Sequence, residues 1–423
     1  MKPGNCRRLR SEDVPWLAGV LCALLAASPA FALEFDARVK VFGTVAALPA
    51  HDVQRILDDS PALDANFDLR LMFRERAGPF EFIVEHSTTL VSGDSFAFLN
   101  APGATLDQTP AGDAGRAFDL SWEIEDGSRH RSWHRFDRLA VRYRRGDWSV
   151  TLGRQAVSWG NGLVFQPMGL FTPFAPTTVD QEYKAGDDLL LIERLFADGS
   201  DISLLVVGRK DESGGIDRDS SSAAVKWHGF IGQGELELVA ARHYRDEVLG
   251  IGARIPIGGA LARSDIVATR VHGSGWKLSG IVNVDYTLAL FQRTAHVFAE
   301  YFHNGFGVRD LPESPLALPA DLVARLERGE VFNLMRDYVA LGASLVWHPL
   351  WSQSIALIGN LRDGSALLQT SVTYEPGERQ RVQVGWLEPL GGAGEEFGGV
   401  PLAGDGVTRG GASTLFARWV YYF

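Results

Sequence analysis

Apolar and polar residues alternate along most of this chain with a period of two. Between residues 67 and 76, apolar side chains occupy the odd positions from Phe67 to Phe73, and charged side chains such as Arg70 and Arg74 lie between them. The same alternation recurs in 136–144 and 282–288. Successive residues of a β-strand point to opposite faces, so these segments are predicted to be strands with one apolar and one polar face.

About eighteen such segments are found, an even number, as bacterial barrels that close on themselves require. Their expected ranges are 34–47, 66–76, 80–91, 135–145, 148–159, 187–197, 201–210, 221–231, 235–245, 248–257, 262–271, 276–288, 294–304, 337–348, 352–361, 366–375, 380–388 and 412–423.

The connections between these segments alternate in length. Tight turns follow even-numbered strands: Gly78-Pro79, Arg145-Gly146-Asp147, Asp198-Gly199-Ser200, Gly232-Gln233-Gly234 and Glu375-Pro376-Gly377-Glu378. Long stretches follow odd-numbered strands: 48–65, 92–134, 160–186, 305–336 and 389–411, with helical spacing in 51–58 and 319–327. Outer-membrane barrels have short periplasmic turns and long external loops, so this alternation favours one closed barrel with both ends of the chain in the periplasm.

The composition narrows the class of protein. Hydrophobic residues make up 46% of the 423, yet no apolar run after residue 32 is long enough to cross a bilayer as a helix. The formal net charge of −11 excludes a nucleic-acid partner, which would favour a basic surface. An arginine at the lipid midplane costs about 2–4 kcal/mol, so the polar rows are expected to face a wet lumen and the apolar rows to face outer-membrane lipid.

The first 32 residues read as a secretory signal peptide. Arg7, Arg8 and Arg10 precede an apolar run from Val14 to Ala27, and cleavage is expected after Ala32. Both cysteines lie in this segment, so the mature chain, 33–423, has no thiol for a disulfide or metal site, and we expect neither metal nor cofactor.

The last strand ends in GASTLFARWVYYF, with Trp419, Tyr421 and Phe423 on one face. In this respect the chain resembles the Gram-negative outer-membrane β-barrels, whose final strand ends in Phe after alternating apolar positions. The resemblance implies localisation in the cell outer membrane and recognition of this strand by the barrel-assembly machinery.

Charged residues on the predicted inner face are the first candidates for a site. They comprise the basic residues Arg70, Arg74, Arg138, Arg142, Arg144 and Arg154 and the acidic residues Glu81, Glu85, Asp285 and Glu300. Opposed charges at a constriction steer ions by field focusing. The alternative is that these charges pair with one another inside the barrel. The several arginines on nearby strands favour anionic solutes.

The segment from Gly153 to Lys184 is unlike the strands around it. Strict alternation would point Arg154 to lipid, so we predict a β-bulge at Gly153 that turns Arg154 inward and places Trp159 in the outer aromatic girdle. The following loop, 160–186, is predicted to fold into the lumen as a constriction, because exposed apolar rings would be a liability in solvent. Its candidate residues are Phe165, Pro167, Phe171, Pro173 and Phe174. The Gly-Arg-Gln-x-x-x-Trp-Gly block also resembles porin-like barrels, including those of the alginate-export type.

Together these features predict a non-enzymatic outer-membrane channel that passes or exports a small anionic or amphiphilic solute by diffusion. One alternative is a non-conducting barrel that acts as a scaffold or sheath for a periplasmic partner protein, such as an export component or a cytochrome. A third is an outer-membrane hydrolase. This third class is disfavoured, because Ser95 lies in a Gly-Asp-Ser block with no domain around it, while His86 and Ser87 are adjacent and so point to opposite faces.

Overall fold

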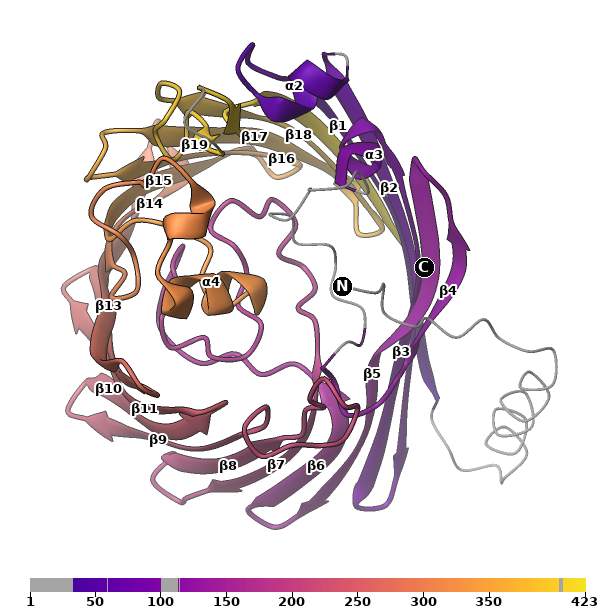
Figure 1. The fold of residues 1–423 in the computed structure, drawn as a ribbon. Helices are drawn as coiled ribbons and strands as arrows, with labels where there is room; N and C mark the ends of the chain where they lie inside the picture. The colour runs from indigo at the N-terminus through magenta and orange to yellow at the C-terminus, as the bar shows by residue number, and fades with distance from the viewer. Residues whose placement is uncertain (1–32, 59, 100–112, 114, 403–405) are drawn as a thin grey trace.

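The computed structural model describes residues 33–58, 60–99, 113, 115–402 and 406–423, and within them the chain forms one antiparallel β-barrel closed by eighteen strands (Figure 1). The wall strands are β1 (Glu34–Ala47), β2 (Ala62–Ala77), β3 (Phe80–Gly93), β5 (His130–Arg145), β6 (Trp148–Gln155), β7 (Asp187–Leu195), β8 (Asp201–Val207), β9 (Ser222–Ile231), β10 (Gly234–His243), β11 (Asp246–Ile257), β12 (Ala260–Val271), β13 (Gly275–Leu290), β14 (Arg293–His303), β15 (Asp337–His348), β16 (Trp351–Asn360), β17 (Ala366–Gly377), β18 (Gln380–Leu390) and β21 (Ser413–Tyr422). This confirms the predicted barrel and its strand count.

The first and last strands close the barrel. β1 pairs with β21 in antiparallel register, from Arg38 opposite Tyr422 to Ala47 opposite Ser413. On β21, Leu415 and Trp419 are exposed on the outer face, whereas Phe416 and Val420 are buried. The predicted division of this strand into a lipid-facing and an inward row is therefore confirmed.

Where the structure describes them, the loops carry four short helical segments and one short antiparallel strand pair. They are α2 (Val53–Leu57), α3 (Asp94–Leu99), the 3₁₀ segment η1 (Pro315–Ala317), α4 (Ala320–Glu327) and the pair of β19 (Val400–Pro401) and β20 (Thr408–Arg409). The helices expected in 51–58 and 319–327 correspond to α2 and α4. Among the described residues, no helix is long and apolar enough to cross a membrane. The signal peptide with its two cysteines lies outside the described residues, so its cleavage stays a prediction.

An additional strand, β4 (Ser121–Asp126), enters the wall where β6 leaves it. β5 pairs with β6 from Arg145 up to Leu139, and above that point it pairs with β4, beginning at Ser121 opposite Arg135. The register between β3 and β5 shifts between Glu85 and His86, so Asp137 is an extra residue in β5 at this level. The wall therefore contains a joint, at which β4 continues the sheet that β6 began.

The predicted bulge at Gly153 is wrong. β6 pairs without interruption through Gly153 and Arg154 with both neighbouring strands, and the irregularity lies one strand away at Asp137. Gly153 instead adopts a φ of +125°, and a Cβ there would lie 2.2 Å from the carbonyl oxygen of Leu139. Only glycine fits this backbone, which turns the chain so that Arg154 is buried while Leu152 is exposed.

Because β6 ends at Gln155, the predicted wall position of Trp159 is also wrong. Trp159 does not lie in an outer aromatic girdle but is buried inside the lumen, where its ring packs edge-on against Phe171 at 5.4 Å. The chain from residue 156 to 186 runs within the barrel, as the magenta trace inside the ring of strands shows (Figure 1).

Candidate functional site: the lumen and the loop that crosses it

Apolar packing holds the loop 156–186 against one side of the lumen. The inner faces of β7 and β8 are apolar, with Leu189, Leu205 and Val207 buried, and they form one cluster with Met168 and Phe171 of the loop. Burial of such side chains contributes about 1.5–3 kcal/mol each. The inner face of the wall is therefore apolar where it contacts the apolar side chains of the loop. This differs from the purely polar inner face that the alternation predicted.

A second apolar cluster fixes the start of the loop. The ring of Phe165 stacks on Phe302 of β14 at 4.6 Å and lies 5.7 Å from Tyr338 of β15. Phe165 and Phe171 are each only 2% exposed. These two predicted constriction residues therefore anchor the loop to the wall and present little surface to a passing solute.

Polar side chains of β13 and β14 reinforce this side. The carboxylate of Glu300 on β14 accepts hydrogen bonds from the backbone nitrogens of Leu163, Val164 and Phe165, at 2.7, 3.0 and 2.7 Å. Asn283 on β13 donates to Glu300 at 2.9 Å. The buried carboxylate is thus satisfied by uncharged donors that come mainly from the loop.

Asn161 makes the second polar anchor. Its backbone nitrogen and side-chain amide both donate to Asp265 on β12, at 2.7 and 2.6 Å. Arg254 of β11 donates to the side-chain oxygen of Asn161, and Asn283 donates to its backbone oxygen at 3.1 Å. Strands β11–β14 together therefore hold residues 161–165 rigidly.

Arginine and lysine side chains on the opposite wall bind the end of the loop. Glu182 pairs with Arg381 of β18 at 2.6 Å and with Arg38 of β1 at 3.2 Å. Asp180 pairs with Lys40 of β1 and with Arg418 of β21, the latter at 2.8 Å. Burial opposes ionisation of Asp180, but Lys40 and Arg418 hold its pKa below the usual value. Asp180 is therefore charged at neutral pH.

Tyr183 continues this contact onto β2 and β3. Its hydroxyl donates to Glu85, and the guanidinium of Arg70 lies 3.4 Å from the centre of its ring. Arg138 lies 4.6 Å from the same ring and donates to the backbone oxygen of Lys184 at 2.6 Å. Three predicted inner-face residues, Arg70, Arg138 and Glu85, thus hold the loop.

The two anchored ends lie on opposite sides of the barrel. In the order of neighbouring strands, β12 is nine steps from β2 in either direction. The loop leaves the wall at β6, reaches β11–β14 with residues 161–165, and returns to β18, β21 and β1–β3 with residues 180–183. It therefore crosses the lumen, as the prediction of a constriction requires.

Lys184 closes the neck of the loop. Its ammonium group donates to the backbone oxygen of Val157 at 2.6 Å and to the hydroxyl of Ser158 at 3.0 Å. Burial lowers the pKa of Lys184 to about 8. Lys184 thus links the end of the loop to its beginning, close to the points where the chain leaves and re-enters the barrel wall.

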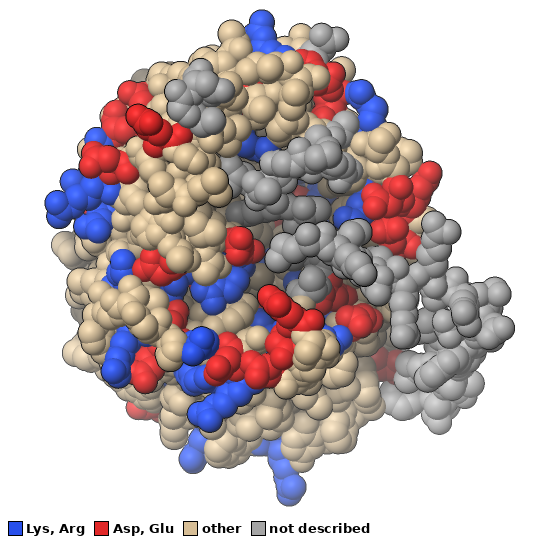
Figure 2. Space-filling view, in the orientation of Figure 1, with Lys and Arg blue, Asp and Glu red and all other residues tan. Residues whose placement is uncertain are grey.

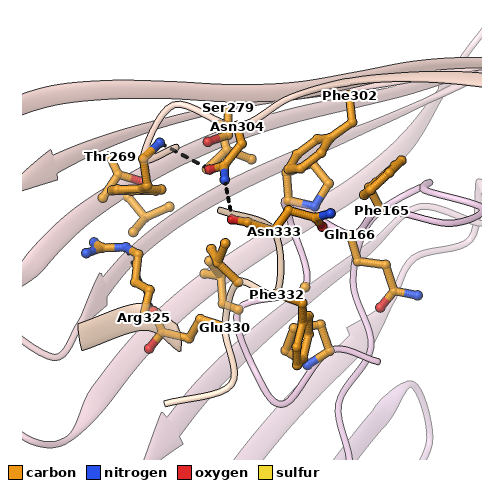
Figure 3. Close-up of a pocket in the computed structure, with 18 of the residues that line it drawn as sticks. Phe165, Gln166, Thr269, Ser279, Phe302, Asn304, Arg325, Glu330, Phe332 and Asn333 are labelled. Atoms are coloured by element: carbon orange, nitrogen blue, oxygen red, sulfur yellow. Dashed lines mark hydrogen bonds and ion pairs between the residues drawn. The ribbon is translucent and has the colours of Figure 1, made fainter. Parts of the chain in front are cut away.

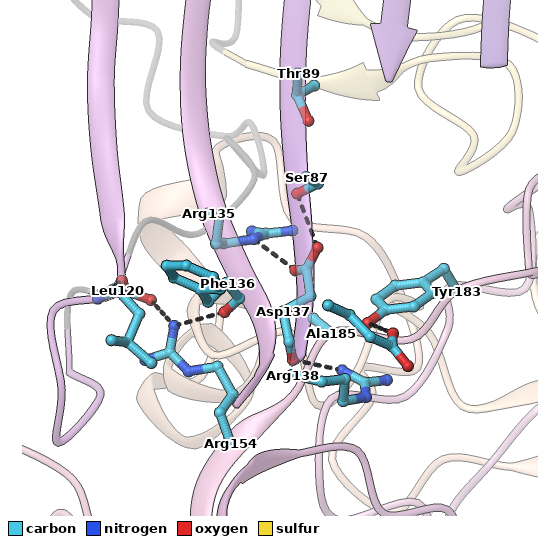
Figure 4. Close-up of polar contacts among 12 residues, drawn as sticks. Ser87, Thr89, Leu120, Arg135, Phe136, Asp137, Arg138, Arg154, Tyr183 and Ala185 are labelled. Carbon is cyan, nitrogen blue, oxygen red and sulfur yellow. Dashed lines mark hydrogen bonds and ion pairs between the residues drawn. The ribbon is translucent and has the colours of Figure 1, made fainter. Parts of the chain in front are cut away.

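Arg154 occupies the joint between β4, β5 and β6 (Figure 4). It is 1% exposed, pairs with Asp188 at 2.8 Å and Asp113 at 2.6 Å, and donates to the backbone oxygen of Phe118 at 2.8 Å. Its guanidinium makes hydrogen bonds at the level where β5 changes its partner from β6 to β4 and the backbone pairing of β5 is interrupted. Arg154 therefore stabilises the wall and is not accessible to a solute.

Arg70 is also engaged by the wall. It donates to Asp137 at 2.6 Å. Asp137 also forms an ion pair with Arg135 at 2.6 Å and accepts a hydrogen bond from Ser87 at 2.8 Å (Figure 4). The residue inserted at the β5 bulge thus lies at the centre of a buried network. The proposed alternative of internal pairing describes Arg70 and Arg154 well.

A different arrangement surrounds Glu81, near the end of the barrel that carries the short turns. Glu81 lies within 3.7 Å of four guanidinium groups, those of Arg74, Arg76, Arg142 and Arg144. The side chains of Arg74 and Arg144 are 46% and 56% exposed. A second carboxylate, that of Glu34, lies 3.7 Å from Arg74. Two carboxylates cannot neutralise four guanidinium groups, so this part of the inner face carries excess positive charge.

The remaining predicted acid, Asp285 on β13, is paired. It accepts from Arg263 of β12 and lies 3.2 Å from the ring nitrogen of His296 on β14. It is therefore a local partner of its neighbours, and Arg263 links it to the loop anchor Asn283, to which the arginine donates at 3.2 Å.

A small cavity of about 70 Å³ lies between the loop, the wall of β11–β14 and the segment that carries α4 (Figure 3). Pro167, Pro173 and Phe174 of the predicted constriction line it together with Phe302 and Phe306. At its edge Glu330 accepts from His243 at 3.0 Å, and Arg325 pairs with Asp246. Burial favours protonation of Glu330, but His243 and the nearby arginines hold its pKa below the usual value.

The segment 391–402 is docked by one carboxylate. Glu396 accepts hydrogen bonds from the backbone nitrogen of Leu334 at 2.7 Å, the hydroxyl of Tyr338 at 2.6 Å and the amide of Asn360 at 2.7 Å. Burial raises the pKa of Glu396 to about 7. Its protonation therefore changes near neutral pH.

The described residues offer little for other chemistry. No three of their His, Cys, Asp or Glu side chains gather closely enough to hold a metal ion. Ser87 is buried in the network of Asp137, whereas the ring of His86 packs against His134 and Phe136, so the two do not face one another. Ser95 is contacted by Gln54 and Asp64.

Several contacts of the loop were not predicted from the sequence. Asp180 and Glu182 stand out as acids in a segment rich in Phe and Pro, and this local contrast was an available signal. Their partners Arg38 and Arg418 also lie on inward-facing positions, but only pairing of β1 with β21 brings them together.

Comparison with known proteins gives the fold and no more. No family model and no curated protein matches the sequence. Similar solved structures include OccAB1 of Acinetobacter baumannii, at 9% identity and a TM-score of 0.51, with 92% of this chain and 96% of that chain covered. OccK11 (OpdR) of Pseudomonas aeruginosa matches at 9% identity and a TM-score of 0.52, with the same shares covered. A variant of OccD1 (OprD) matches at 11% identity and a TM-score of 0.51, over 92% and 95%.

These neighbours are porins of Gram-negative outer membranes. The chain therefore has the fold of the Gram-negative outer-membrane porins, as its alternation and its last strand predicted. The similarity to barrels of the alginate-export type stays a prediction.

Proposed function

We propose that this protein is an outer-membrane channel through which small anionic solutes diffuse. The crossing loop would divide the lumen into narrower passages, and the arginines around Glu81 would raise the local concentration of anions near the periplasmic opening. The observation that carries the proposal is the excess of two positive charges in this cluster, where four guanidinium groups on partly exposed side chains face the carboxylates of Glu81 and Glu34. A low-dielectric wall focuses such a field on passing ions.

The mechanism uses diffusion down a gradient and involves no covalent step. Guanidinium groups bind carboxylates and phosphates through paired hydrogen bonds, so a solute that carries either group would exchange between Arg74, Arg76 and Arg144. Their exposure keeps each contact weak, which favours release as well as entry. Arg154 and Arg70, which are buried and paired with acids of the wall and its neighbouring segments, would act only indirectly.

Single-channel recording in planar bilayers tests this function. The wild-type protein should conduct with a preference for anions, and the triple variant Arg74→Gln, Arg76→Gln, Arg144→Gln should lose at least about twofold in the anion-to-cation permeability ratio. Arg293→Gln, at the exposed first residue of β14, is the matched control. Unchanged selectivity in the triple variant would contradict the anion preference, and absence of conductance even after deletion of 161–183 would overturn the channel.

A second candidate is a non-conducting barrel that serves a periplasmic partner protein. The observation that favours it is the double attachment of the loop, which ties opposite walls together through ion pairs and buried hydrogen bonds. Copurification with a periplasmic protein together with zero conductance would support this alternative.

A further inference from the structure

The outer face of β10–β12 carries a row of charged residues in an otherwise apolar surface. Arg242 of β10 lies opposite Glu247 of β11, Glu247 lies opposite Arg270 of β12, and Arg270 lies opposite Trp276 of β13. The sequence neighbours His243, Val248 and Val271 are buried on the inner side, so this row points outward. It lies near the strand ends at the long-loop side, where a charge on a porin wall costs only about 0–1 kcal/mol.

Next to this row the outer wall is hollowed. A shallow groove of about 660 Å³ runs over β7–β11, because two outward positions on neighbouring strands, Ala223 and Ala240, are small. Leu204 and Val206 border it on one side and Leu249 on the other, and all three are exposed. Such a groove fits an extended hydrocarbon chain.

Basic side chains gather where the groove meets the rim. Arg242 pairs with Asp219 at 2.6 Å, Arg245 lies 3.6 Å from the same carboxylate, and Arg270 pairs with Glu247 at 3.4 Å. Three guanidinium groups thus face two carboxylates, and the imidazole of His272 contacts Arg245. The side chains of Arg245 and Arg270 are 55% and 60% exposed, which leaves donors available to a ligand. Basic and acidic side chains alternate around the rim at this end of the barrel (Figure 2).

We propose that this site binds a phosphorylated, acylated lipid of the outer leaflet, with one acyl chain in the groove over Ala223 and Ala240 and a phosphate group on Arg245 and Arg270. Arg242 and Glu247 of the charged row line the groove itself, so the apolar groove adjoins the basic rim, which matches the order of tail and head in an amphiphile. Guanidinium groups bind phosphate through paired hydrogen bonds and remain charged at every physiological pH. The site lies outside the lumen, so it is independent of the proposed transport.

Native mass spectrometry of the purified protein in mild detergent tests the proposal, with bisphosphorylated lipid A as the probe. The wild-type protein should retain one lipid A and should bind fully dephosphorylated lipid A at least about tenfold more weakly, since two or more charge-assisted hydrogen bonds are lost. Arg245→Gln with Arg270→Gln should weaken lipid A binding to a similar extent. Free inorganic phosphate at equal concentration should not displace the lipid.

The groove is tested separately by filling it. Ala223→Leu with Ala240→Leu should weaken lipid A binding, whereas Ala343→Leu, an outward alanine of β15 between Val297 and Ile355, should leave it unchanged. Heat-modifiable migration in electrophoresis verifies that each variant is a folded barrel. Equal retention by wild type and both double variants would overturn the proposal. Displacement by inorganic phosphate, or loss only in the arginine variant, would also overturn it, because either outcome would indicate an anion site at the rim without a seated chain.

Discussion

The backbone nitrogen of Phe165 donates a hydrogen bond of 2.7 Å to the carboxylate of Glu300, a residue 135 positions further along the chain. Two further loop nitrogens share this carboxylate. One wall residue therefore determines where the loop begins its crossing of the lumen.

Replacement of Glu300 by alanine is expected to release residues 161–165 while the barrel remains closed. Each buried donor left unsatisfied costs about 1–3 kcal/mol, so the loop should become mobile within the lumen. Single-channel recordings should show a larger and noisier conductance than wild type. The control is Glu378→Gln in the β17–β18 turn, and conductance equal to wild type in a folded Glu300→Ala barrel would contradict this anchoring role.

The double variant Asp180→Asn, Glu182→Gln tests the other end of the loop. It removes two negative charges and leaves Arg38, Lys40, Arg381 and Arg418 with fewer partners, so the lumen becomes more positive. The reversal potential under a salt gradient should shift further toward the anion value, and the shift should shrink at high salt because screening lengths shorten. A shift toward cations would refute this assignment.

Arg154 and Arg144 should respond in opposite ways to substitution. Arg154→Met leaves Asp188 without its buried cationic partner and Asp113 with Arg116 alone. It should cost about 3–5 kcal/mol of stability, seen as a lower temperature of barrel unfolding on electrophoresis. Ion selectivity of the folded fraction should stay unchanged. Arg144→Gln, at a half-exposed position, should alter selectivity with a stability change within about 0.5 kcal/mol. The reverse outcome would return Arg154 to the solute path.

Docking of the segment 391–402 should depend on pH through Glu396. Its folded pKa of about 7 lies above the ordinary value of 4.5, so the folded state binds the proton more tightly, and the stabilisation present at low pH is lost as the pH rises through 7. Asp363, which accepts from the backbone nitrogen of Glu396, adds to the negative charge there. Hydrogen exchange in 391–402, corrected for intrinsic rates, should be faster at pH 8 than at pH 6. Glu396→Gln should abolish the difference, and a pH dependence that survives in this variant would point to another group.

The barrel itself was predictable because its signals are local. Alternation with period two and the lengths of connections follow from strand geometry and from the lipid on one face and water on the other, and these give the strand count, the closure and the outward row of β21. The entry of the 160–186 loop into the lumen followed from its apolar rings. The position of the bulge was not predictable, since the pattern within β6 required an irregularity without saying which strand carried it. The structure places it at Asp137, where β4 replaces β6 beside β5.

The sequence by itself therefore determined the class of fold, the outward and inward faces, and the loop that narrows the lumen. Only the tertiary structure decided which inward charges are neutralised by ion pairs, as at Arg154 and Arg70, and where positive charge remains in excess, as around Glu81. The physical reason is distance along the chain. Asn161 meets Asp265 after 104 positions and Glu182 meets Arg381 after 199, and no local pattern encodes a pairing that exists only once the barrel has closed.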